Sequence, residues 1–181
     1  MLWLNEPARW SVDNGELTVA ADPGTDFWRT TGYGYTRDTG HLYGEQADGE
    51  FDLSVRVRAA YGAQYDQAGA MVRVDERRWL KTGVEYFDGK MRLSTVVTLD
   101  YSSWAVGELP PGAAEITLHL ARRGDSVEVR YGVDGGEPAE LAAVAYLPPG
   151  ERVLAGAMCA APEGPGFDAS FRDLAIVSRP G

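Results

Sequence analysis

The residues best suited to chemistry lie between positions 65 and 104, where polar side chains recur inside segments that otherwise resemble β-strands. Gln67, Lys81 and Glu85 are the clearest examples. Side chains alternate along a strand, so Lys81 and Glu85 share one face of theirs, and Gln67 joins them if its strand is the neighbour. An amide, an ammonium group and a carboxylate on one sheet surface can bracket a polar ligand. The pattern therefore predicts a binding face, although a solvated polar surface is the alternative.

Aromatic residues are expected to surround this face. Asp26, Trp28, Tyr33 and Tyr35 fall in an early loop-rich stretch of the sequence. Aromatic rings cover the apolar C–H side of a sugar, while acidic and amide groups hold its hydroxyls. Ordinary packing in a core is the alternative for each aromatic residue. The predicted ligand-binding residues are Asp26, Trp28, Tyr43, Gln67, Lys81, Glu85 and Trp104.

A catalytic acid pair is not evident along the sequence. Retaining glycosidases place two carboxyl groups about 5 Å apart, and inverting ones about 6.5–9.5 Å. The nearest local match begins at Glu50, but the third acid that such a strand motif needs is missing. A pair assembled across strands, such as Asp26 with Glu85, stays open. No catalytic residue is therefore predicted, and a glycoside hydrolase or lyase remains the alternative to a binding protein.

Metals, cofactors and nucleic acid are not expected as ligands. His41 and His119 are far apart and Cys159 is the single cysteine, so no zinc pattern exists. The sequence also lacks a phosphate-binding glycine loop and an EF-hand loop. A calcium ion held by irregular loops stays open. The net charge of −10, with scattered basic residues, argues against nucleic acid and anionic membranes.

The elements that position these residues are expected to be strands. Residues 51–59 alternate apolar and polar side chains, which is typical of a strand with one buried face. Residues 79–87 could form a short helix, because Lys81 and Glu85 are four apart, but their β-branched and aromatic neighbours favour a strand. Further strands are expected at 10–12, 16–21, 67–73, 91–98, 116–122 and 127–131, and residues 167–177 are expected to form a final strand pair or one long strand. The predicted fold is all-β, a two-sheet antiparallel β-sandwich of jelly-roll type.

Length and hydropathy set the remaining expectations. Residues 1–181 are expected to form a single domain. No signal-peptide pattern and no long apolar run is present, which predicts a cytoplasmic protein without membrane partners. Cys159 lies in an apolar run and is expected in the core. The oligomeric state is left open.

The segment YDQAGAMVRVDERRWLKTGVEYFDG, followed by LSTVVTLDYSSW, resembles the domain-of-unknown-function 1349 family. The opening WLNEPARWSVDNGELTVAADPGTDFWRTTGYGY and the DTGH before GEFDLSVRV fit this family as well. Its members are described as concanavalin A-like lectin/glucanase sandwiches, often regulation-of-enolase-like. The resemblance implies a jelly roll with a concave face and no established reaction. One departure is Gly32, where a His would be expected; a ligand contact from that position would be missing here.

Three functions are therefore weighed. The leading hypothesis is a carbohydrate-binding or carbohydrate-related module that uses the concave sheet face. The second is a glycoside hydrolase or lyase with an acid pair assembled across strands. The third is a protein-interaction module that regulates a metabolic enzyme, which would make a protein the partner.

Overall fold

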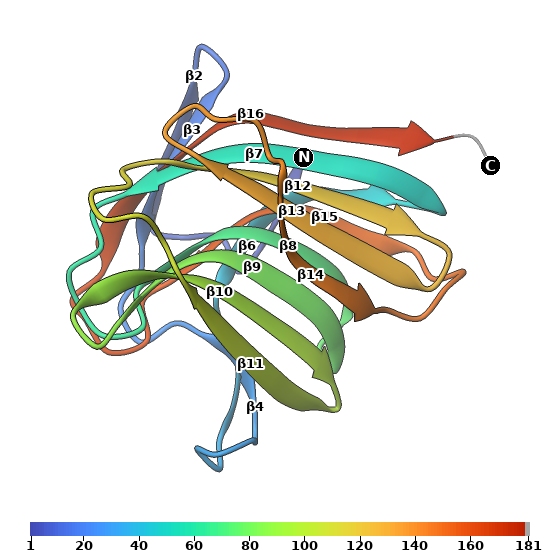
Figure 1. The fold of residues 1–181 in the computed structure, drawn as a ribbon. Helices are drawn as coiled ribbons and strands as arrows, with labels where there is room; N and C mark the ends of the chain where they lie inside the picture. Colours follow the sequence, from blue (N-terminus) through green and yellow to red (C-terminus); the bar gives the residue numbers. More distant parts are fainter. Residues whose placement is uncertain (180–181) are drawn as a thin grey trace.

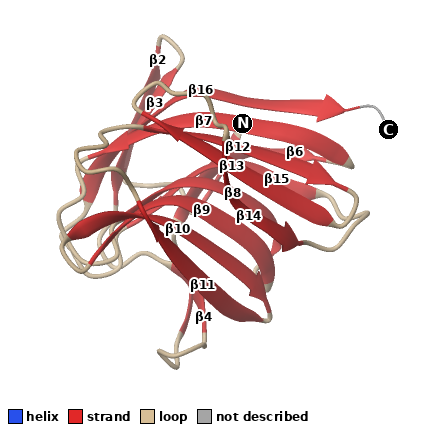
Figure 2. Ribbon diagram, in the orientation of Figure 1, coloured by secondary structure: helices blue, strands red, loops and turns tan. Residues whose placement is uncertain are grey.

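The computed structural model describes residues 1–179, which form two antiparallel sheets packed face to face (Figure 1). Figure 2 shows strands joined by loops and no helix in this range. The predicted all-β, two-sheet antiparallel sandwich is confirmed. Residues 79–87 belong to a strand rather than to a helix.

Each large sheet contains seven strands. Sheet A has the order β1 (Leu2–Leu4), β6 (His41–Ala47), β15 (Val153–Ala160), β8 (Gln67–Asp75), β9 (Arg78–Phe87), β10 (Lys90–Leu99) and β11 (Tyr101–Glu108). Sheet B has the order β14 (Glu140–Tyr146), β13 (Ser126–Val133), β12 (Ile116–Arg123), β7 (Glu50–Ala59), β16 (Phe167–Arg179), β3 (Glu16–Ala21) and β2 (Arg9–Asp13). A separate hairpin pairs β4 (Phe27–Arg29) with β5 (Thr36–Asp38).

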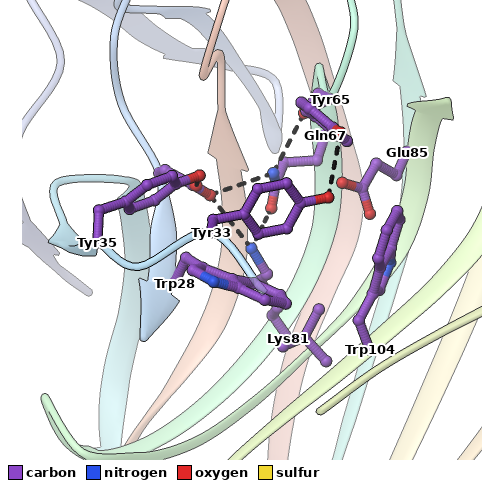
Figure 3. A pocket seen from close by; sticks show the side chains of 10 residues that line it. Trp28, Tyr33, Tyr35, Tyr65, Gln67, Lys81, Glu85 and Trp104 are labelled. Atoms are coloured by element: carbon purple, nitrogen blue, oxygen red, sulfur yellow. Dashed lines mark hydrogen bonds and ion pairs between the residues drawn. The ribbon is translucent and has the colours of Figure 1, made fainter. Parts of the chain in front are cut away.

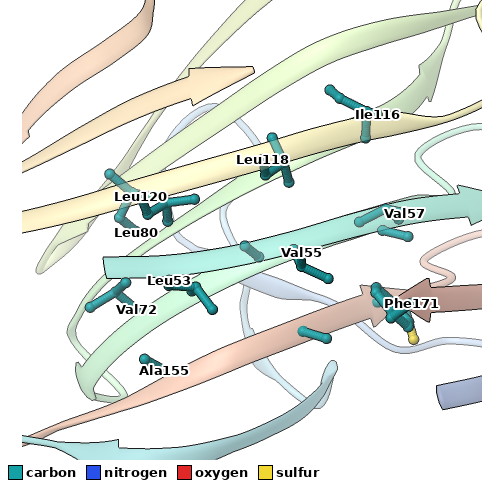
Figure 4. Close-up of a cluster of buried hydrophobic side chains, with 14 of the residues drawn as sticks. Leu53, Val55, Val57, Val72, Leu80, Ile116, Leu118, Leu120, Ala155 and Phe171 are labelled. Atoms are coloured by element: carbon teal, nitrogen blue, oxygen red, sulfur yellow. The ribbon is translucent and has the colours of Figure 1, made fainter. Parts of the chain in front are cut away.

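The main core lies between the two sheets, and alternation along the strands of sheet B supplies much of it. Leu53 and Val55 of β7 and Leu118 and Leu120 of β12 point inward and are at most 1 % exposed (Figure 4). Burying such a side chain contributes about 1.5–3 kcal/mol. The alternation predicted for residues 51–59 is therefore what attaches β7 to the core.

Strand β15 was not predicted, because it has no alternation. All of its residues are buried, including Cys159, since the core covers one face and the β4–β5 hairpin contributes to covering the other. A strand buried on both faces reads as a continuous apolar run. Strands β1, β4, β5, β6, β11 and β14 were also missed. Residues 167–177 form one long strand, β16, with irregular register between Arg172 and Ala175.

Glycine pairs allow neighbouring strands of sheet A to approach closely. Gly69 of β8 stands opposite Gly83 of β9, and Gly44 of β6 stands opposite Gly156 of β15. A Cβ added at Gly69 would lie 2.6 Å from the Cα of Gly83, which is far inside contact distance. These glycines are therefore needed for packing backbone against backbone.

The β4–β5 hairpin covers part of the outer face of sheet A and creates a second, smaller core. Phe27 and Trp28 of the hairpin pack with Met71 and Trp79 of the sheet. The backbone N–H of Arg29 also donates to the Ser102 hydroxyl of β11, at 2.9 Å. This cover brings an early loop of the sequence over the polar residues of β8 and β9. No helix among the described residues is long and apolar enough to span a membrane.

Candidate functional site

The predicted polar row exists and is buried. Gln67 of β8 stands opposite Glu85 of β9, and Lys81 lies on the same face of β9. All three are at most 5 % exposed, although they lie on the outer face of sheet A, because the hairpin and its aromatic residues cover them. The alternative of a solvated polar face is therefore wrong.

Lys81 forms the base of the site. Its ammonium group donates to the Phe27 carbonyl oxygen at 2.7 Å and to Gln67 Oε1 at 2.5 Å, and it lies 3.5 Å from Asp26 Oδ1. These contacts use all three of its N–H groups. Lys81 therefore holds the start of the hairpin against the sheet, and it has no donor left for a ligand in this arrangement.

Asp26 is similarly engaged within the protein. Its Oδ1 accepts the backbone N–H of Phe27 at 2.8 Å, and its Oδ2 accepts the Tyr35 hydroxyl at 3.1 Å. Gln67 Nε2 approaches the same Oδ1 at 3.4 Å. Burial, together with the negative charge of Asp26, raises the pKa of Tyr35 to about 12, so this hydroxyl remains a donor. Asp26 thus fixes the floor of the site.

Glu85 differs because only one of its oxygens is tied to the protein. Its Oε2 accepts the Ser94 hydroxyl at 2.5 Å, and Ser94 in turn accepts the indole N–H of Trp104 at 3.0 Å. Within residues 1–179, Ser94 donates directly to Oε2, Trp104 adds a weaker hydrogen-bonding contribution to the carboxyl group, and the group lines the pocket (Figure 3). Burial raises the pKa of Glu85, although the charge of Lys81 and the Ser94 bond oppose that shift. Glu85 is therefore a positioned carboxyl group with one oxygen available to a ligand.

The raised pKa of Glu85 predicts an unusual pH dependence of stability. Below its ordinary value of 4.5 the group is protonated in both states, and above it the unfolded state loses the proton first. Protonated Glu85 therefore makes its full contribution to the free energy of unfolding below the ordinary pKa of the unfolded state. That contribution is lost as the pH rises through the raised pKa of the folded state. Glu85→Gln lacks this titration, so its free energy of unfolding should increase relative to wild type as the pH rises above 4.5. Urea unfolding over this rise in pH tests the prediction, and a difference that does not change with pH would contradict it.

Aromatic rings form the walls of the pocket. Tyr33 packs edge-on against Trp28 with ring centroids 5.4 Å apart, and Tyr65 packs edge-on against Trp104 at 6.2 Å. The hydroxyls of Tyr33 and Tyr65 meet at 3.1 Å across the top (Figure 3). The space left open is about 20 Å³, which is room for about one water molecule. The pocket is therefore nearly closed in this conformation.

Six of the predicted ligand-binding residues line this one pocket. They are Asp26, Trp28, Gln67, Lys81, Glu85 and Trp104. Tyr33, Tyr35, Tyr65 and Val96 complete it and were not among the predicted site residues. The aromatic residues on either side of Gly34 could have indicated Tyr33 and Tyr35. Nothing in the strand alternation indicated Tyr65.

Tyr43 lies elsewhere. It belongs to β6 and points into the space between the sheets, where its ring packs 4.8 Å from Trp3 and 5.8 Å from Trp10. Its position in the alternation places it on the opposite face of sheet A from Leu42, which contacts the hairpin. Tyr43 is thus a packing residue at one edge of the sandwich, and placing it in the binding site was wrong.

The described part of the chain holds no group of three or more His, Cys, Asp or Glu side chains arranged to bind a metal ion. His41 is used structurally, because its Nε2 accepts the backbone N–H of Asp22 at 3.0 Å and its Nδ1 lies 2.6 Å from the Asn5 carbonyl oxygen. The pocket itself offers two carboxyl groups, Asp26 and Glu85, and both oxygens of Asp26 already accept hydrogen bonds from the protein.

A family model described as a protein of unknown function (DUF1349) matches residues 3–179. The chain belongs to the DUF1349 family. Regulation of enolase protein 1 of Saccharomyces cerevisiae is 35 % identical over 176 residues, which cover 97 % of this chain and 88 % of that protein. An uncharacterized protein of Emericella nidulans, AN7484, is 29 % identical over 140 residues, covering 73 % of this chain and 68 % of that one.

Solved structures show the same sandwich. A functionally unknown protein from Saccharomyces cerevisiae, 34 % identical, superposes with a TM-score of 0.93 over 99 % of this DUF1349 chain and 97 % of that one. Carbohydrate binding module CBM66 from Bacillus subtilis gives 0.62 at 13 % identity, covering 97 % and 95 % of the two chains. The GH43 protein BlXynB from Bacillus licheniformis gives 0.70 at 13 % identity, over 96 % of this chain but only 36 % of that one. Likeness at such low identity shows the shared fold alone.

Proposed function

We propose that the pocket binds one neutral sugar residue, either free or at the end of a glycan. The observation that carries this proposal is a buried, positioned carboxyl group, Glu85, between the aromatic walls of Trp28 and Trp104. Aromatic faces suit the C–H side of a sugar, and a fixed carboxyl oxygen accepts bonds from its hydroxyls. A neutral sugar fits better than an anionic one, because Asp26 and Glu85 would repel a further carboxylate.

The hydrogen bonds within the site divide its residues into two groups. Lys81, Gln67 and Asp26 bond to one another and to the hairpin, so they hold the pocket together. Glu85 has a free oxygen, and the hydroxyls of Tyr33 and Tyr65 bond to each other in the absence of a ligand. Recognition of the sugar is therefore assigned to Glu85 and the two tyrosines.

A ring can enter only when Tyr33 moves, because the closed pocket has room for little more than water. Tyr33 is 46 % exposed, and its hydroxyl bonds to that of Tyr65. It lies between Gly32 and Gly34, whose φ angles are 72° and 74°. Positive φ angles are easily adopted by glycine, so the turn can reorganise at low cost. Sugar hydroxyls would then replace the bond between the two tyrosines.

Binding is better supported than hydrolysis. Both oxygens of Asp26 already accept hydrogen bonds, from the Phe27 N–H and the Tyr35 hydroxyl. To act as a nucleophile or general base, Asp26 would have to share or break these bonds. The sandwich is shared with a carbohydrate binding module and with part of a GH43 protein, which makes a carbohydrate ligand plausible for a binding role.

Glu85→Gln is expected to weaken sugar binding at least about tenfold, because a hydrogen bond to a charged group contributes roughly 1.5–3 kcal/mol. Trp104→Ala should weaken it by removing one wall and the Ser94 contact that positions Glu85. A glycan array would identify the sugar, and titration calorimetry would measure the affinity of each variant.

Glu108→Gln and Trp10→Ala are the matched controls, since they change the same residue types outside the pocket. Both should bind as the wild type does. The proposal is contradicted if no neutral sugar binds, or if both pocket variants keep wild-type affinity.

A second candidate function is the regulation of a metabolic enzyme by direct contact. The yeast relative that is 35 % identical carries the name regulation of enolase protein, and this supports a protein partner. Affinity capture from lysate would separate the two functions. An enzyme held in stoichiometric amount, unaffected by sugar and by Glu85→Gln, would favour regulation.

A further inference from the structure

The two sides of the sandwich at which the sheets end differ in how the gap between the sheets is filled. On one side, β1 ends sheet A and β2 ends sheet B, and their tryptophans meet. Trp3 of β1 packs edge-on against Trp10 of β2 at 5.4 Å, and Tyr43 packs beside both. Large aromatic side chains thus close the gap between the sheets on this side.

On the other side, β11 ends sheet A and β14 ends sheet B (Figure 1). The inward-facing residues there are small. Ala143 and Ala145 of β14 stand opposite the buried Val129 and Val127, so they face the interior, yet they remain partly exposed. A groove of about 550 Å³ remains between the two strands, lined by small and apolar residues.

Exposed apolar side chains gather along the strands on this side of the sandwich, and three of them, Val106, Leu141 and Val144, line the groove. Of the twelve large hydrophobic residues exposed within residues 1–179, six lie on β11, on β14 or at the adjoining end of β10. They are Leu99, Tyr101, Val106, Leu141, Val144 and Tyr146. A concentration of exposed apolar side chains on a soluble protein marks an interaction surface.

The edge of β14 has few of the devices that normally prevent strand pairing: one register irregularity beside Ala142 and one charge, at Glu140. Its sequence, Glu140-Leu-Ala-Ala-Val-Ala-Tyr146, has one charge at its first position and contains no Lys or Pro. Edge strands are usually protected by charges, Pro, bulges or short length. By comparison, β1 is only 3 residues long, and β2 carries charges at both ends. The outer N–H and C=O groups of β14 are therefore available to another strand.

We propose that β14 pairs antiparallel with β14 of a second copy of this chain, joining the two B sheets across a twofold axis. Antiparallel pairing places Glu140 of each copy beside the Tyr146 end of the other, so no like charges face each other. This matters for a chain of net charge −10, whose copies repel each other over a surface rich in acidic residues. The strand is thus complementary to itself, as a twofold interface requires. Val144 and Leu141 of each copy would become covered.

This inference is independent of the sugar pocket, which lies on the outer face of sheet A. Trp104 lines the pocket and also borders the groove, but no residue of β14 lines the pocket. Loss of one property therefore need not change the other.

Light scattering during size-exclusion chromatography tests the proposal across a dilution series. The wild type should run at twice the 19.6 kDa of one chain, and Val144→Lys should halve that mass. Val12→Lys is the matched control, because Val12 is 51 % exposed on the opposite edge strand, and it should stay dimeric. A monomeric wild type, or a Val144→Lys variant that remains dimeric, would overturn the proposal.

Hydrogen exchange on the wild type provides a readout that does not depend on a variant folding. Amides on the free edge of β14 should exchange more slowly at high protein concentration than at low concentration, while those of β11 should not change. Equal exchange of β14 at both concentrations would count against pairing. A monomer that instead captures another protein through β14 would assign the edge to a different partner and would also overturn the proposal.

Discussion

Gly69→Ala is expected to destabilise the protein by about 3 kcal/mol or more, a large fraction of the stability of an ordinary domain. The new Cβ would fall on the Thr82 carbonyl and lie 2.6 Å from the Cα of Gly83. Both neighbours are backbone, so no side-chain rotation can relieve the clash, and β8 and β9 must separate. Separation would also disturb Gln67 and Glu85, which stand opposite each other two residues along.

Gly62→Ala is the control for this prediction. Gly62 has no atom within 4 Å of an added Cβ, and its φ is not positive. The free energy of unfolding of this variant should therefore stay within about 0.5 kcal/mol of wild type. Urea unfolding followed by tryptophan fluorescence measures both variants. Equal stability of the two would show that sheet A does not need the close approach of β8 and β9.

Asp26→Ala is expected to cost about 3–5 kcal/mol, because it leaves the buried ammonium group of Lys81 without its counter-charge. Both side chains of this pair are at most 6 % exposed. The same change also frees the Phe27 N–H and the Tyr35 hydroxyl, which both donate to Asp26. The hairpin should then loosen from sheet A.

A double-mutant cycle and an exposed ion pair serve as controls. Asp26→Ala combined with Lys81→Met should cost clearly less than the sum of the single changes, since no unpaired charge remains. Asp48→Ala breaks the exposed contact with Arg152 at 3.0 Å and should cost at most about 1 kcal/mol. Denaturant unfolding of the four variants tests this. Strict additivity at positions 26 and 81 would contradict a coupled buried pair.

The binding site could be predicted in part because its polar members are out of place in their strands. Lys81 and Glu85 interrupt a segment whose other residues suit a sheet, and period-two alternation puts them on one face. Local sequence could not show which of these two side chains keeps a polar atom available to a ligand. That depends on Ser94 reaching Glu85 and on the Phe27 carbonyl reaching Lys81, contacts between strands and between layers.

Tyr43 shows where reasoning from composition fails. An aromatic residue near other aromatic residues is as common in a hydrophobic core as in a sugar-binding site. Only the face of the strand on which it lies distinguishes the two. Strand β6 was not predicted, so its faces could not be assigned. In the structure Tyr43 points inward to Trp3, while the pocket forms on the other side of the same sheet.

The sequence by itself determined the all-β sandwich, the inward face of strands such as β7, the polar row of β8 and β9, and the family resemblance. These features depend on alternation and on short turn motifs, which are local. Tertiary structure alone decided that the hairpin covers the row, that Asp26 and Lys81 bond to the hairpin, and that Ser94 bonds to only one oxygen of Glu85. It also decided which side of the sandwich is closed and which is open. Each of these depends on residues far apart in the chain meeting in space, and no pattern within one strand contains that information.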